Sequence, residues 1–535
     1  MPGRASFSFR FLAVSSSLLV VSCALRAPRE EAARVTRAPQ TLPVLEADEE
    51  PTPRTPGTRV PAMVLKDWGV NPTVETAAEP LSTFAADVDT ASYALARAYL
   101  TRGVLPDEAA VRVEEFVNAF DYGYRPPKDD AFAVQVEAFP SPNRKGYHVL
   151  HVGVKAREVA KADRKPSHLV FTIDVSGSMA QQNRLGLVKQ ALGLLVNELD
   201  ERDRVSIVVY GTSARVVLPP TAATQRERLL EAIDRLSPEG STNVEAGLSL
   251  AYDLAMKGFV PGGINRVILC SDGVANNGVT EAGALWQTVK GRASEGVTLS
   301  TVGFGLGNYN DVLMERLADQ GDGQAVYVDT LDEARRVFVE QLTGTLQVVA
   351  KDVKLQLEFN PRVVERYRLL GFENRALAAR DFANDRVDAG ELGAGHAVTA
   401  IYEVKLSGKA DDAAFAVFRA RFKAPQGGAS QLIEKPLPMA VIRADAKAAT
   451  GPARLSLVVA GFAEKLRGSY WARNRTWDSL LAELSTLPPG LSDRADVIEL
   501  ASLIRTAKSL DRRPDRFEAK APLATMDFDR LPVIE

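Results

Sequence analysis

Val170-Phe171-Thr172-Ile173-Asp174-Val175-Ser176-Gly177-Ser178 is the stretch from which the fold of this chain can be inferred. Its first four residues are apolar or β-branched without polar alternation, which predicts a strand covered on both faces, as in a parallel α/β sheet. Ligands of such sheets bind at the carboxyl ends of the strands. The carboxylate of Asp174 and the hydroxyls of Ser176 and Ser178 are hard oxygen donors, which suit Mg²⁺ or Mn²⁺ rather than zinc.

Two later segments favour a metal site over the alternative, a turn whose Asp or Ser only caps the next helix. Gly240-Ser241-Thr242-Asn243 precedes a second amphipathic helix. Arg266-Val267-Ile268-Leu269-Cys270-Ser271-Asp272-Gly273 is a second buried strand, and it ends in Asp-Gly. Three oxygen-bearing loops, each at the carboxyl end of a predicted strand or at the start of a helix, can converge on one ion.

These three pieces, in this order, resemble the metal-ion-dependent adhesion site of the von Willebrand factor type A domain, also called the integrin I-type domain. The resemblance implies that Ser176, Ser178 and Thr242 supply hydroxyls to a Mg²⁺ or Mn²⁺ ion. It implies that Asp174 and Asp272 supply carboxylates, some of the ligands acting through water. It also implies a protein partner whose Asp or Glu carboxylate fills the remaining position on the metal.

The A-type domain is expected to span residues 167–344, where strands and helices alternate. This alternation predicts an α/β domain with a doubly wound, mostly parallel sheet. Residues 303–307 are rich in glycine but lack the spacing of a dinucleotide fingerprint, so a tight strand-to-helix turn is expected there. Cys270 lies in an apolar strand and is expected to be a buried, unreactive thiol. His396 is expected to be a turn histidine at the start of a strand.

The segments around the A-type domain have other patterns. Residues 67–155 combine helices with a predicted hairpin and form an N-terminal α+β module, in which Asp87 and Asp89 are expected to cap a helix rather than bind metal. Residues 345–445 alternate apolar and polar side chains, which predicts an antiparallel sandwich or half-barrel. Residues 452–512 carry the apolar stripes of helices.

The N-terminal end resembles a bacterial lipoprotein signal. Arg4 and Arg10 precede an apolar or small segment, residues 11–21, which is too short to span a bilayer as a helix. The resemblance implies that the signal covers residues 1–23 and that Cys23 is lipidated, with the mature chain anchored to the cell envelope and facing the periplasm or exterior. The alternative is an ordinary secretory signal with Cys23 incidental.

The rest of the mature chain extends this resemblance to a subfamily of bacterial secreted lipoproteins that carry an A-type domain. Residues 367–375 and 388–396 are very like stretches that follow the A domain in that subfamily. Residues 24–66, rich in Pro, Arg, Glu and Thr, predict a disordered tether, and residues 513–535 predict a loose tail.

Composition is that of a soluble globular protein, with 46% hydrophobic and 25% charged residues among 535. A formal net charge of −3 and the lack of a long basic run predict no nucleic-acid partner. The leading hypothesis is a metal-dependent adhesion or scaffold module, which is not an enzyme. One alternative is a metal-assisted hydrolase, although no His or Lys candidate for proton transfer stands beside the motif. The other is a structural scaffold with a vestigial site, which the five suitable ligand residues disfavour.

Overall fold

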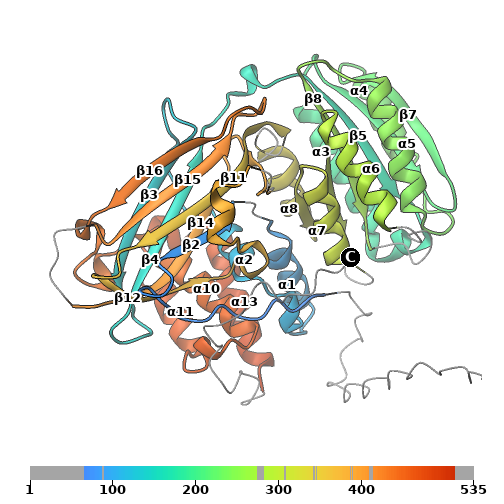
Figure 1. Cartoon of the computed structure of the whole chain (residues 1–535). Helices are drawn as coiled ribbons and strands as arrows, with labels where there is room; N and C mark the ends of the chain where they lie inside the picture. Colours follow the sequence, from blue (N-terminus) through green and yellow to red (C-terminus); the bar gives the residue numbers. More distant parts are fainter. Residues whose placement is uncertain are drawn as a thin grey trace, which may run out of the picture. The chain divides into compact units, whose positions relative to one another are not determined.

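The computed structural model describes most of the chain (Figure 1). The described residues are 65–86, 89–273, 282–305, 309–340, 344, 346–385, 387, 389–408 and 414–512. The predicted signal with Cys23, nearly all of the predicted tether and the predicted tail therefore lie outside the described residues. Among the described helices, none has both the length and the apolar character that crossing a bilayer requires.

The A-type segment contains a six-stranded sheet in the order β10-β9-β8-β5-β6-β7. All neighbouring strands in it are parallel except β6 and β7. The strands are β5 (Ser167–Asp174), β6 (Arg204–Tyr210), β7 (Ala214–Ala222), β8 (Ile264–Ser271), β9 (Val297–Phe304) and β10 (Ala325–Val328). The predicted α/β fold with a mostly parallel sheet is confirmed. Strand β10 was not predicted, because four residues are too few to display a periodic pattern.

Helices cover both faces of this sheet, as the unbroken apolar character of β5 predicts. One face is covered by α3 (Arg184–Glu198), α4 (Arg226–Asp234), α8 (Leu331–Arg335) and the π-helix η4 (Arg336–Glu340). The other face is covered by α5 (Val244–Lys257), α6 (Ala282–Ser294) and α7 (Asp311–Gln320). Successive side chains of β5 alternate between the two faces, since Phe171 packs with the first group of helices and Val170 with the second.

The antiparallel strand β7 forms one edge of this sheet. Its pairing with β6 is irregular between Ile207 and Val205, opposite the pair Pro219 and Pro220. Prolines lack an amide donor, so this edge is poorly suited to pairing with a further strand.

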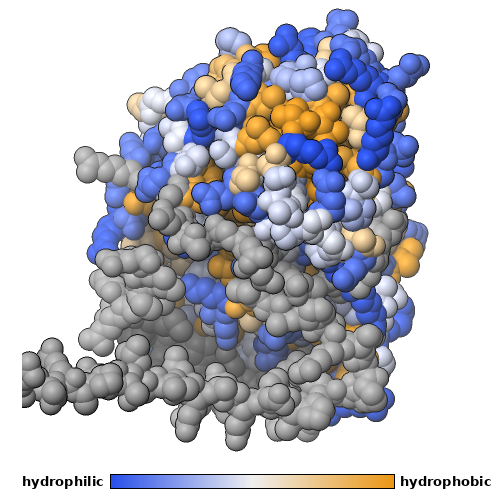
Figure 2. Space-filling model, turned by 90° about the vertical axis from the view of Figure 1, so that its right-hand side faces the viewer, coloured by the Kyte–Doolittle hydropathy of each residue, from blue (hydrophilic) through white to orange (hydrophobic). Residues whose placement is uncertain are grey.

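Figure 2 shows the face on the side of β7, α5 and α6, where apolar side chains gather among hydrophilic ones. Val216 of β7 is 40% exposed.

Two antiparallel sheets make a sandwich outside the A-type segment, as predicted for residues 345–445. The first has the order β1-β12-β14-β4-β3, and the second β13-β11-β15-β16 with β2 also paired to β11. The strands of the first are β1 (Val74–Glu75), β3 (Phe132–Pro140), β4 (His148–Ala156), β12 (Val364–Leu370) and β14 (Ala397–Leu406). Those of the second are β2 (Leu81–Ala85), β11 (Val348–Phe359), β13 (Leu392–Gly393), β15 (Ala416–Lys423) and β16 (Gln431–Leu437). Alternate side chains of both sheets form one buried core between them.

Strands from both sides of the A-type segment share this sandwich. β4 pairs with β14, and β2 pairs with β11. The A-type segment is therefore inserted between Ala156 at the end of β4 and Val348 at the start of β11. This arrangement was not predicted, because a period-two pattern identifies a strand but not its neighbour in a sheet.

A helical layer covers the outer face of the first sheet of the sandwich (Figure 1). It contains α1 (Ala91–Thr101), α2 (Val113–Asn118), α10 (Gly451–Leu466), α11 (Trp477–Ser485), α12 (Pro489–Ser492) and α13 (Ala495–Leu510). Phe139, Val149 and Ile401 of the sheet pack against this layer. Helix α1 also packs on the A-type sheet, because Leu95 and Tyr99 belong to the core cluster of α5, α6 and α7.

The prediction that Asp89 caps helix α1 is wrong. Thr90 is the residue at the cap position, and its side chain makes no capping hydrogen bond. The carboxylate of Asp89 instead accepts a hydrogen bond from the backbone N of Ala325 (2.9 Å) and pairs with Arg375 (2.7 Å). Asp89 thus ties the N-terminal module to β10, a contact between segments distant in sequence. Asp87 lies outside the described residues.

Buried neutral histidines predict acid sensitivity of the fold. His151 lies between the sandwich and α10, where Nε2 shares a hydrogen bond with Tyr124 Oη and Nδ1 one with Ser456 Oγ (2.8 Å each). Burial lowers the pKa of His151, and likewise of His168 and of the turn residue His396, to about 4. The unfolded chain therefore binds more protons between pH 4 and 6.5. Stability present above pH 6.5 is lost as pH falls, by up to about 1.4 kcal/mol per pH unit for each histidine.

The measurement is the free energy of unfolding of the wild type and of His151→Gln across this pH range. The variant lacks one of the groups that must charge on unfolding, so its stability should fall less steeply with decreasing pH. Equal slopes for the two proteins would contradict the assignment to His151.

Candidate metal centre

The predicted ligand residues lie at the carboxyl edge of the A-type sheet. Asp174 is the last residue of β5, and Asp272 directly follows the last residue of β8. These two strands are parallel neighbours, so their carboxyl ends meet at the same edge. Ser176 and Ser178 follow Asp174 in the turn that leads through the 3-10 helix η3 (Gly177–Asn183) into α3.

Four of the five predicted ligand residues are joined by hydrogen bonds. The backbone N of Ser176 donates to Asp174 Oδ1 (2.8 Å), and the hydroxyls of Ser176 and Ser178 share a hydrogen bond (3.0 Å). The hydroxyl of Ser178 donates to Asp272 Oδ1 (3.0 Å). The structure therefore brings two carboxylates and two hydroxyls into one cluster, as predicted from Asp174-Val175-Ser176-Gly177-Ser178 and from the Asp-Gly that ends the second strand.

The fifth residue, Thr242, is placed by its loop rather than by its side chain. It is half-buried just before α5, and Gly240 O in the same loop accepts a hydrogen bond from Gly177 N (3.2 Å). Within the described part of the chain, no side-chain hydrogen bond joins Thr242 to the other four residues. The third oxygen-bearing loop thus adjoins the first, while the hydroxyl of Thr242 makes no direct link to the cluster.

Two further residues of the cluster were not found from the sequence. The hydroxyl of Ser271 donates to Asp174 Oδ2 (3.0 Å), and the guanidinium of Arg184 pairs with Asp272 Oδ2. Ser271 was recognisable as the neighbour of Asp272 at the end of a predicted strand. Arg184 belongs to no recognisable motif. Its side chain lies beside the cluster only because of the course that the backbone takes in the turn before α3.

The electrostatics of the cluster favour a bound cation. Asp174 is 1% exposed, and burial raises the pKa of its carboxyl from 3.8 to about 6, against the hydrogen bonds from Ser176 and with a further rise from nearby Asp272. The hydrogen bonds that Asp174 accepts come from a backbone amide and a hydroxyl, and no ion pair to it is found among the described residues. A buried carboxylate with only neutral donors is stabilised by a metal ion.

The donor set fits Mg²⁺ or Mn²⁺. The described residues hold no group of three or more His, Cys, Asp and Glu side chains that would bind a metal. The cluster instead combines two carboxylates with serine hydroxyls, all of them hard oxygen donors. Asp174, Ser176, Ser178 and Asp272 would hold the ion here, with Thr242 available from the adjoining loop. Their role as ligands stays a prediction.

No histidine is placed beside this cluster. His168 is at the start of β5, so roughly 20 Å of strand separates it from Asp174. His148 and His151 belong to β4, and His396 precedes β14, both in the sandwich. The thiol of Cys270 is fully buried, which raises its pKa and makes it unreactive, as predicted. That the site is not catalytic stays a prediction.

Family models match three consecutive parts of the chain. The model described as von Willebrand factor type A domain matches residues 168–342. The model described as von Willebrand factor matches residues 62–151, and the one described as uncharacterized protein YfbK, C-terminal, matches residues 344–510. Type A domains commonly mediate protein interaction or adhesion. The A-type domain that the turn motif predicts is thereby confirmed.

Similar proteins come from several bacteria. The uncharacterized protein YfbK of Escherichia coli is 41% identical over 436 residues, which cover 77% of this chain and 75% of that protein. The uncharacterized protein sll0103 of Synechocystis is 28% identical over 40% of this chain and 50% of its own length. A solved structure of a von Willebrand factor type A protein from Catenulispora acidiphila is 18% identical, with a TM-score of 0.41, and covers 73% of this chain and 93% of its own.

Proposed function

The chain belongs to the family of the Escherichia coli protein YfbK, and we propose that it is a divalent-metal-dependent protein-binding module of the cell envelope. Its A-type domain would hold Mg²⁺ or Mn²⁺ at the carboxyl edge of the sheet and capture a carboxylate of a protein partner there. The role is adhesion or scaffolding rather than catalysis.

One observation carries this proposal: the hydrogen-bonded cluster of Asp174, Ser176, Ser178 and Asp272 at the ends of two parallel strands. Serine hydroxyls are neutral, so a divalent ion held by them and by few carboxylates keeps residual positive charge. An incoming Asp or Glu side chain then gains a charge-assisted bond to the metal. A site with three or four carboxylates would leave no such charge.

The envelope location rests on the N-terminal sequence. Arg4 and Arg10, the apolar residues 11–21 and Cys23 support export and lipid attachment. A lipid on Cys23 followed by residues 24–66 as a tether would hold the A-type domain near the membrane surface. Metabolic labelling with a radioactive fatty acid tests this part, since a Cys23→Ser variant should lose the label.

Partner capture should depend on both metal and Asp174. The full chain, immobilised and incubated with envelope extract in Mg²⁺, is expected to retain a partner that EDTA releases and that renewed Mg²⁺ restores. Asp174→Ala should retain none of it, while Asp253→Ala should behave as wild type, because Asp253 is 57% exposed on α5 and away from the cluster.

Other results would favour the other functional classes. Partner binding that survives EDTA unchanged would refute metal-dependent capture. Turnover of an envelope polymer or phosphoester by the purified chain, lost in Asp174→Ala, would establish a metal-assisted hydrolase. The absence of any Mg²⁺ binding would favour a structural scaffold with a vestigial site.

A further inference from the structure

A buried arginine shares the candidate metal centre with the two carboxylates. Arg184, the first residue of α3, pairs with Asp272 Oδ2, and its Nη1 also lies 3.4 Å from the backbone O of Ser178. The side chains of Arg184 and Asp272 are only 5% and 6% exposed. One carboxylate oxygen of the centre is therefore held by an internal cation, whereas Asp272 Oδ1 faces the hydroxyl of Ser178.

The end of β9 is shaped to admit this arginine. Gly305 follows β9 with a φ of +77°, a conformation that favours glycine. A Cβ at this position would lie 2.5 Å from Nε and 2.7 Å from Cδ of Arg184, so any other side chain would displace the arginine. Gly305 at the end of β9 thus provides the space for Arg184.

We infer that Arg184 is a positioning residue of the metal centre, which trades metal affinity for affinity toward an anionic partner. This inference rests on the proposed function. With Arg184, the two carboxylates and the arginine leave one net negative charge, and a bound Mg²⁺ turns it into one net positive charge. Without Arg184 the metal would enter a doubly negative centre and leave it neutral. The arginine therefore keeps charge available for a carboxylate ligand.

The test removes the charge of Arg184 and keeps a hydrogen-bond donor. In Arg184→Gln, calorimetry of the full chain with Mg²⁺ alone is expected to give a dissociation constant about tenfold lower than in wild type, since one repelling charge beside the ion is lost. With Mn²⁺ bound, acetate should displace water from the ion, read as a fall in water-proton relaxation. The variant is expected to need about tenfold more acetate for half of this effect.

A second variant displaces Arg184 without removing its charge. Gly305→Ala leaves every charge of the chain in place but takes the space of the arginine, so the same two shifts are expected in the same directions. If wild type binds Mg²⁺ and the folded variants match it in both measurements, the role of Arg184 is refuted while the proposed function stands. If wild type itself binds no Mg²⁺, the proposed function fails.

Discussion

Asp174→Asn is expected to abolish the stabilisation by Mg²⁺ that the proposed function predicts, while making the metal-free protein more stable. Asparagine has the same shape and can still accept the hydrogen bond from Ser176 N, but it carries no charge to bind the ion. The rise of the carboxyl pKa from 3.8 to about 6 corresponds to roughly 3 kcal/mol of instability at neutral pH. This cost is absent below pH 3.8, grows as pH rises to 6, and is removed by the substitution.

The measurement is the unfolding midpoint of wild type and variant, each in EDTA and in Mg²⁺. Wild type should melt lower than Asp174→Asn in EDTA and rise with added Mg²⁺, because an ion that binds only the folded state stabilises it. The unfolding midpoint of Asp174→Asn should not rise with added Mg²⁺. Asp253→Asn serves as the control for the loss of a carboxylate from the same domain. A midpoint of Asp174→Asn that rises with Mg²⁺ as in wild type would exclude Asp174 as a ligand.

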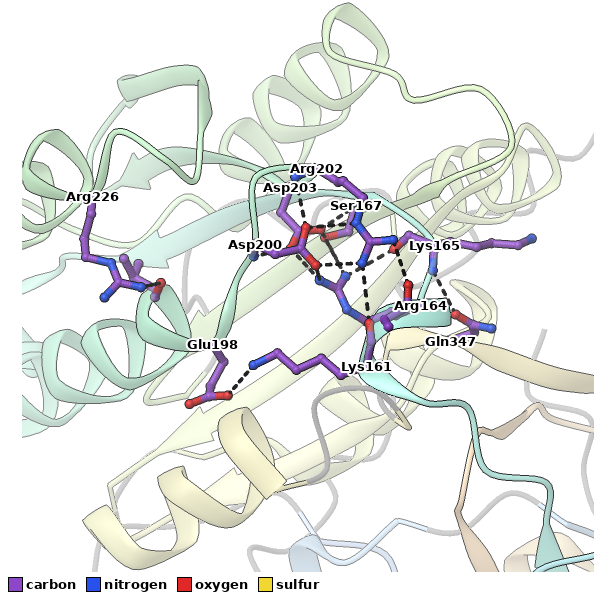
Figure 3. Close-up of polar contacts among 12 residues, drawn as sticks. Lys161, Arg164, Lys165, Ser167, Glu198, Asp200, Arg202, Asp203, Arg226 and Gln347 are labelled. Atoms are coloured by element: carbon purple, nitrogen blue, oxygen red, sulfur yellow. Dashed lines mark hydrogen bonds and ion pairs between the residues drawn. The ribbon is translucent and has the colours of Figure 1, made fainter.

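Arg164→Ala is expected to cost the A-type domain about 3–5 kcal/mol, the usual loss when one member of a buried ion pair is removed. Arg164 is 1% exposed and pairs with Asp203, which is fully buried (Figure 3). Asp203 Oδ1 also accepts hydrogen bonds from the backbone N and the hydroxyl of Ser167 (2.9 and 2.7 Å). Without Arg164, the carboxylate of Asp203 would stay buried and lose its ion-pair partner.

This cluster lies at the amino ends of β5 and β6, where the chain enters the A-type domain. The segment in which the chain leaves the A-type domain also lies beside this cluster, since Lys165 N donates a hydrogen bond to Gln347 Oε1 (3.1 Å; Figure 3). Chemical unfolding of the full chain is the measurement, with Arg202→Ala as the matched control. Arg202 pairs with Asp200 in the same cluster but is 38% exposed, so its loss should matter much less. Equal losses of unfolding free energy in Arg164→Ala and Arg202→Ala would contradict the importance of burial.

The motif Asp174-Val175-Ser176-Gly177-Ser178 and the Asp-Gly that ends the second strand were sufficient to predict the A-type domain and to place four of its candidate ligand residues at one edge of the sheet. A hydrophobic run ending in Asp174 identifies a buried parallel strand, and the same pattern recurs in the strand that ends before Asp272. Because the carboxyl ends of neighbouring parallel strands must meet, two loops far apart in sequence could be placed together. Local patterns of this kind also gave most helix and strand positions, since each depends on the spacing of nearby side chains.

Contacts that depend on the whole fold were beyond such patterns. Asp89 was predicted to cap a helix because it directly precedes a predicted helix. Its carboxylate instead binds Ala325 and Arg375 from distant segments. Likewise, nothing near Arg184 in sequence marks it as a partner of Asp272. The partners of a long side chain depend on which residues lie near it in space. That arrangement is known only from the assembled tertiary structure.

The sequence alone therefore establishes the A-type sheet, the chemistry of its oxygen donors and the antiparallel character of the flanking strands. All of these follow from periodicity and from short motifs, which act within a few residues. The pairing of β2 with β11 and of β4 with β14, and the arginine beside the candidate metal centre, emerge only from the tertiary structure. Pairing and charge compensation are set by long-range packing, because each depends on segments that come together only when the chain folds.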